Sequence, residues 1–63
     1  MNMMTKYNGI YYNKENWKYT AIILMDNQVI YEETFSDELT AVLSRKMFIV
    51  KFLSKKMREK IRW

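Results

Sequence analysis

The sequence predicts an α+β fold: a three-stranded antiparallel β-meander over residues 7–35, then one long amphipathic C-terminal helix over residues 36–62. Two observations support it. Before residue 36, β-branched and aromatic residues gather in runs that short polar segments separate. After it, apolar residues recur at helical spacing and no Gly or Pro interrupts them. At 63 residues we expect a single domain, residues 1–63.

The expected strands are joined by polar turns. The first, residues 7–12, is short and aromatic, and the second, residues 17–25, is rich in β-branched and aromatic side chains. Asp26 and Asn27 both tolerate the left-handed backbone that a two-residue hairpin loop requires. Residues 28–35 therefore return beside the second strand as the third.

The helix is expected to begin at Ser36, which can cap it, and Asp37 and Glu38 lie where the positive end of the helix dipole favours acids. Its apolar residues form a stripe that we assign to the sheet. The members of this stripe are Leu39, Val42, Leu43, Val50, Leu53, Met57 and Ile61.

The expected helix is longer than the sheet. From residue 37 to residue 62 it would extend about 39 Å at ~1.5 Å per residue, whereas residues 28–35 as a strand span only about 27 Å. We therefore expect the last turns to overhang the sheet, to bend near Ser54 or to pack on a partner. A second interpretation makes the β-rich residues 47–52 a fourth strand, but no turn residue separates them from the preceding helix.

The composition argues against catalysis. The chain has no Cys and no His, which removes the thiolate, the commonest general base and the commonest metal ligands. It has no glycine-rich phosphate loop, and Glu32 and Glu33 are adjacent on a strand, so they point to opposite faces. We predict a non-catalytic binding protein with no catalytic residue, no metal and no cofactor.

The sequence also predicts where the protein works. No apolar run approaches the ~20 residues of a membrane span, and residues 1–6 lack the apolar region of a signal peptide. We expect a cytoplasmic protein without a membrane partner. The bias toward Lys, Asn, Tyr, Ile and Met is what an A/T-rich genome produces, as in many bacteriophages, and a viral protein would act in the host cytoplasm.

The net charge of +4 is unevenly distributed. Residues 1–40 hold three Lys against six acids, a net charge of −3, and residues 41–63 hold eight basic residues against one acid, a net charge of +7. In the expected helix, spacings of four, three and four residues align a basic stripe, which is either a solvated face or a contact for nucleic-acid phosphates or an acidic partner. The basic stripe consists of Lys51, Lys55, Arg58 and Arg62.

The expected sheet has two apolar faces. The face assigned to the helix carries Ile22, Leu24, Val29, Tyr31 and Phe35. The opposite face carries Trp17, Tyr19, Ala21, Ile23, Met25 and Ile30. This second face is too apolar to stay open to water, so either the register slips, or terminal residues cover it, or it binds a partner.

Six aromatic and aliphatic residues are the candidates for partner binding. A partner surface on the sheet would be centred on Trp17 and Tyr19, residue types enriched at interface hot spots, and would include Ile23 and Ile30. Phe48 and Phe52 lie four residues apart and away from the apolar stripe of the helix, which favours a partner groove or the seam of a homodimer.

Three short runs resemble the AP2-type and integrase arm-binding domains: residues 9–14 (GIYYNK), 17–22 (WKYTAI) and 35–38 (FSDE). The resemblance covers about residues 9–50 and implies a three-stranded sheet packed on one helix. In those families the sheet enters the DNA major groove and reads it with Arg and Lys on the strands. This chain departs there, because it has Glu32 and Glu33 where those families have a Leu-Gly step, and an acidic face opposes DNA contact.

Small phage proteins that inhibit host or defence enzymes are similar in kind, being tiny, free of cofactors and polarised in charge. The leading prediction is therefore a phage-type accessory protein that inhibits or modulates a host or anti-phage defence protein by direct protein–protein contact. The alternative is a nucleic-acid-binding domain that uses the basic C-terminal helix. A third option is a self-associating module whose dimer forms along Phe48 and Phe52.

Overall fold

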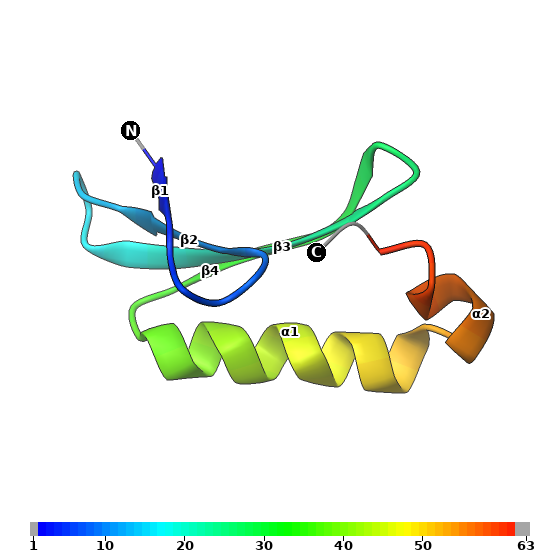
Figure 1. The fold of residues 1–63 in the computed structure, drawn as a ribbon. Coiled ribbons are helices and arrows are strands. Elements are labelled where there is room, and N and C mark those ends of the chain that lie inside the picture. The colour runs from blue at the N-terminus through cyan, green and yellow to red at the C-terminus, as the bar shows by residue number, and fades with distance from the viewer. Residues whose placement is uncertain (1, 62–63) are drawn as a thin grey trace.

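The computed structural model describes residues 2–61 and has an α+β fold with an antiparallel sheet and one long helix. The sheet order is β1-β2-β3-β4, so strands that follow one another in sequence are neighbours in the sheet. The helices lie on one side of the sheet, α1 along it and α2 at its far end (Figure 1). The elements are β1 (Asn2–Met4), β2 (Ile10–Asn13), β3 (Lys18–Met25), β4 (Gln28–Phe35), α1 (Glu38–Phe52) and α2 (Lys55–Arg58).

The expectation of three strands was incomplete, because β1 adds a fourth at the edge of the sheet. Met3 pairs with Tyr12 and Met4 with Tyr11. The turn that returns β1 to β2 is held by Thr5, whose backbone N–H donates to Ile10 O at 3.0 Å and whose hydroxyl donates to the same oxygen at 3.0 Å. A three-residue strand is too short to show an alternating pattern in the sequence.

The β3–β4 hairpin has the predicted two-residue loop, with φ of 52° at Asp26 and 65° at Asn27. The ladder is then interrupted, because Leu24 pairs with Val29 while Ile23 pairs with Tyr31. Ile30 is therefore the extra residue of a β-bulge.

This bulge overturns the predicted sheet faces. On β3, the residues facing α1 are Tyr19, Ala21, Ile23 and Met25, all of which were assigned to the open face. On β4, Tyr31 and Phe35 do face α1 as predicted, since they pair with Ile23 and Tyr19. Ile22, Leu24 and Val29 lie on the opposite face, where the first two are half-buried and Val29 is exposed.

The region expected to form a single helix, residues 36–62, contains two helices, α1 and α2, in the part that the structure describes. Asp37 rather than Ser36 caps α1, and its Oδ2 accepts from the backbone N–H of Thr40 at 2.9 Å. Residues 47–52 are helical, as expected over the strand alternative. Of the three alternatives for the end of the helix, the structure has the bend near Ser54, as a full break: Leu53 is extended (φ −110°, ψ 130°), and the Ser54 hydroxyl accepts from the Met57 N–H at 3.2 Å to begin α2.

The core is small. Among the side chains that the structure describes, the buried apolar ones are Ile10, Ala21, Ile23, Met25, Ala41 and Leu53. Tyr7, Tyr19, Tyr31, Phe35 and Val42 pack around this centre and are half-buried. Beyond the break, Ile61 forms an antiparallel bridge with Met25, so the chain after α2 returns to the end of β3.

Candidate binding surfaces

Trp17 occupies the last position of the turn between β2 and β3. Its φ is 59°, a left-handed conformation that is costly for a bulky residue, and its side chain is 74% exposed. Hydrogen bonds hold the turn: the Trp17 N–H donates to Asn13 O at 2.9 Å, and the Lys18 N–H donates to Asn16 Oδ1 at 3.1 Å. The indole is therefore presented to solvent on a turn of defined shape.

Other large side chains lie beside Trp17. The Tyr12 ring lies 6.4 Å from the Trp17 ring in an edge-on arrangement and 5.0 Å from the Tyr19 ring. Met3 and Met4 on β1 are exposed, and with Tyr12 and Tyr19 they line a shallow hollow of about 410 Å³. We call this surface the aromatic end, consisting of Met3, Met4, Tyr12, Trp17 and Tyr19.

The structure separates the other predicted sheet residues from this surface. Tyr19 belongs to it but also packs against the core, so it is half-buried. Ile23 is completely buried under α1 and offers nothing to a partner. Ile30 is 36% exposed at the bulge, at the other end of β4 from Phe35, which pairs with Tyr19.

Phe48 and Phe52 form a row of rings with Tyr31 along the edge of α1. The Phe48 ring lies 4.6 Å from the Tyr31 ring and 5.1 Å from the Phe52 ring. Phe48 is half-buried against the sheet, while Phe52 is 69% exposed at the end of α1. The Tyr31 hydroxyl donates to Glu33 Oε1 at 3.1 Å, and burial, followed by this carboxylate, raises the Tyr31 pKa.

The basic stripe is interrupted where the helix breaks. Lys51 and Lys55 are exposed, but they lie on different helices. Arg58 turns back instead: its Nε donates to Leu53 O at 3.1 Å and its Nη2 to Val50 O at 3.3 Å. Arg58 thus satisfies carbonyls at the end of α1. Arg62 lies outside the described residues.

The sequence pattern did not reveal an apolar stripe on the side of α1 that faces away from the sheet. Its members follow at spacings of four, four and three residues, which places them on one side of the helix, and each is more than half exposed. They were overlooked because most had been assigned to the sheet-facing stripe. We call this surface the outer stripe, consisting of Leu39, Leu43, Met47 and Val50.

The sheet-facing side of α1 is apolar too, which is why the single stripe predicted from the sequence was wrong and combined residues from both sides. Ala41 is fully buried, and Val42, Phe48 and Ile49 are half-buried. The sequence held one signal of a second apolar side: apolar residues at helical spacing extend further around α1 than one sheet can cover.

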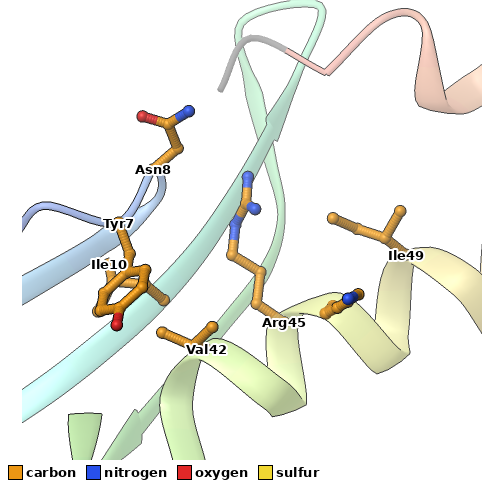
Figure 2. Close-up of a pocket in the computed structure, with 7 residues that line it drawn as sticks. Tyr7, Asn8, Ile10, Val42, Arg45 and Ile49 are labelled. Atoms are coloured by element: carbon orange, nitrogen blue, oxygen red, sulfur yellow. The ribbon is translucent and has the colours of Figure 1, made fainter. Parts of the chain in front are cut away.

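A pocket of about 250 Å³ lies between the turn before β2 and the middle of α1. Figure 2 shows Tyr7, Ile10 and Val42 gathered at one side of it and Ile49 at the other, with the Arg45 side chain extending between them toward the sheet. Arg45 Nε donates to Ile22 O at 2.7 Å. Partial burial lowers the Arg45 pKa from its usual high value.

Within residues 2–61, no cluster of three acidic side chains has the arrangement of a metal site. No helix in the same range is long and apolar enough to cross a membrane. Comparisons of this chain with protein-family models, with curated proteins and with solved structures found no match.

Proposed function

We propose that the protein is a non-catalytic binding protein that holds another protein at the aromatic end. The observation that carries this proposal is Trp17, a bulky side chain that is 74% exposed on a left-handed backbone. Glycine adopts that conformation freely, whereas another residue pays roughly 1–2 kcal/mol. A tryptophan in this conformation adds no stability to a protein with so small a core, and backbone strain of this kind is typical of functional positions.

The neighbours of Trp17 fit a protein partner. Trp and Tyr are the residue types most enriched at interface hot spots, and here they adjoin Met3 and Met4, whose flexible side chains adapt to a partner's surface. Lys6 and Glu38 also line the hollow, so its edge offers a charge of each sign. Because the hollow is shallow, it suits a protruding side chain or a short peptide segment rather than a deeply enclosed small molecule.

The small size, the lack of His and Cys, and the A/T-type composition are together typical of a phage accessory protein. We propose that the partner is a host or anti-phage defence protein, which the aromatic end inhibits or modulates by direct contact.

Trp17→Gly provides the test. The substitution removes the indole and relieves the left-handed strain, but it also adds freedom to the unfolded chain and loses the contact with Tyr12, so the free energy of unfolding should change by less than about 1 kcal/mol while partner capture is lost. The measurements are urea denaturation and a pull-down from a host lysate, with and without nuclease. Met57→Ala, which trims an exposed side chain on α2, is the control and should change neither result.

Tyr19 stays unchanged in this test because it packs against the core, so its removal would mix folding with binding. Capture by the Trp17→Gly protein at the wild-type level would contradict the proposal. Capture that nuclease abolishes and that Lys51→Ala with Lys55→Ala weakens would instead support the alternative, nucleic-acid contact through exposed lysines at the C-terminal end.

A further inference from the structure

We infer that the outer stripe of α1 binds a second copy of this chain, with the two α1 helices antiparallel. This inference concerns a different surface from the aromatic end and does not rest on the proposed function. Leu39, Leu43, Met47 and Val50 are 60%, 58%, 51% and 57% exposed, and they form one continuous row along the helix. Single exposed apolar residues are ordinary, but a row of four on one helix marks a contact surface.

The size of the core explains why this row needs a permanent cover. Among the side chains that the structure describes, two of the six buried apolar residues are alanines, and only Ile10 and Ile23 are large with less than 2% exposure. A chain of 63 residues with such a core has little stability to spare. A second copy is present wherever the protein is made, so it can supply this burial before any other partner is met.

Charge selects the antiparallel arrangement. Asp37 stands at the N-terminus of α1, and Lys51 at its last turn with Lys55 just beyond, whereas Glu38 faces the hollow of the aromatic end. Antiparallel helices place the acidic N-terminus of each copy beside the basic last turn of the other and oppose the helix dipoles favourably. Parallel helices would bring like charges together at both ends.

The spacing of the outer stripe is compatible with this arrangement. When two such helices cross near the middle of the row, Leu43 of each copy meets Met47 of the other, and Leu39 approaches Val50. The row is therefore complementary to itself about a two-fold axis, as a closed dimer requires.

The edge of the sheet is a poorer place for self-association. β4 is an edge strand of eight residues, but the bulge at Ile30 distorts it and Glu32 and Glu33 add negative charge. Bulges and charges are the devices by which edge strands avoid pairing with one another. The helix, which carries no such protection, is the surface that a second copy would use.

Sedimentation equilibrium over low to high micromolar concentrations tests the dimer. We expect a mass that rises to twice the chain mass and stops there. Leu43→Lys should raise the dissociation constant at least about tenfold, because it places a charge in the contact. Val29→Lys is the matched control, since Val29 is 54% exposed on the sheet, and it should leave the mass unchanged. A monomer throughout, or growth beyond a dimer, would overturn the inference.

If Leu43→Lys does not fold, thermal melting of the wild-type protein tests the dimer instead. The melting temperature of the wild-type protein should then rise with protein concentration, as it does when association stabilises the folded state. A melting temperature that is independent of concentration would overturn the inference. Trp17→Gly should retain the dimer, so failure of the dimer and failure of the proposed function give different results.

Cysteine cross-linking tests the orientation, because the natural chain has no Cys. A mixture of Leu39→Cys and Val50→Cys proteins should form a mixed disulfide rapidly under mild oxidation, while each variant alone should not link to itself. Rapid self-linking of Leu39→Cys would show parallel helices and contradict the arrangement. A dimer without any mixed disulfide would show that α1 is not the contact.

Discussion

At the scale of single residues, Gly9 and Arg45 fix the place where β2 begins beside the middle of β3. Gly9 has a φ of 75°, and its carbonyl accepts from the Ile22 N–H at 2.8 Å, while Ile22 O accepts from Arg45. A Cβ at Gly9 would lie 2.8 Å from Ile22 O and would meet the Arg45 guanidinium group. Only glycine allows the turn, the strand and the arginine to come this close.

Gly9→Ala should therefore lower the free energy of unfolding by about 2 kcal/mol, since it combines left-handed strain with displacement of Arg45. Urea denaturation followed by circular dichroism measures the loss. Asn8→Ala, at the neighbouring exposed position, is the control and should cost little. A loss no larger than that of the control would show that the turn rearranges without cost.

At the scale of elements, the break between α1 and α2 depends on Arg58. The last carbonyls of a helix have no partner within it, and Arg58 supplies one for Val50 O and one for Leu53 O. Because both bonds come from one guanidinium group, the arginine ties α2 to the end of α1. The residue expected to contact phosphates thus has a structural role within the chain.

Arg58→Lys keeps the charge but loses the planar group that reaches two carbonyls. We expect the free energy of unfolding to fall by about 1 kcal/mol, with a loss of helical signal. Lys55→Ala, which removes an exposed charge from the same helix, should leave the stability within about 0.5 kcal/mol of wild type. Equal stability of the Arg58→Lys and wild-type proteins would show that the two bonds contribute nothing net.

The elements also show how far the sequence could be read. The pairing of residues 17–25 with 28–35 and the loop at Asp26 and Asn27 follow from local propensity and were predicted. The two faces of the sheet were predicted wrongly, because the extra residue Ile30 moves the side chains after it on β4 to the other face relative to β3. No local pattern marks that bulge; the burial of Tyr31 and Phe35 against α1 accompanies it.

For the candidate binding surfaces, the sequence identified some of the residues but neither their backbone conformation nor the side of the element on which they lie. Trp17 was predicted to be exposed on a partner surface, and its exposure is seen, but its left-handed backbone depends on the turn that Asn13 and Asn16 build. The outer stripe was missed because Leu39 and Leu43 fit a sheet-facing stripe equally well by spacing. Choosing between the two sides of α1 requires knowing where the sheet lies.

At the scale of the whole molecule, the chain is a thin slab of 36 × 21 × 17 Å, one helix layer on one sheet. A slab exposes much surface for its volume, which is why few residues are buried. Its most protected part should be the middle of β3, where β2 and β4 pair on either side and α1 covers one face.

Hydrogen–deuterium exchange should reproduce this order. The amides of Ala21 and Ile23 in β3 should exchange slowest, and those of α2 fastest among the helices, because α2 has four residues and no buried side chain. Nuclear magnetic resonance at several times after dilution into D₂O measures this directly. Amides of α2 protected as well as those of β3 would show that the C-terminal segment is part of the central cooperative unit.

The simple strand order has a consequence for the speed of folding. Because β1, β2, β3 and β4 lie in the sheet in the order of the sequence, most contacts join segments that are close along the chain. Chains of this kind have little loop-closure entropy to overcome and fold quickly for their size. The bridge between Met25 and Ile61 joins distant segments, and it should form last. A newly made chain would thus complete its sheet and α1 before the segment around Ile61 pairs with the end of β3.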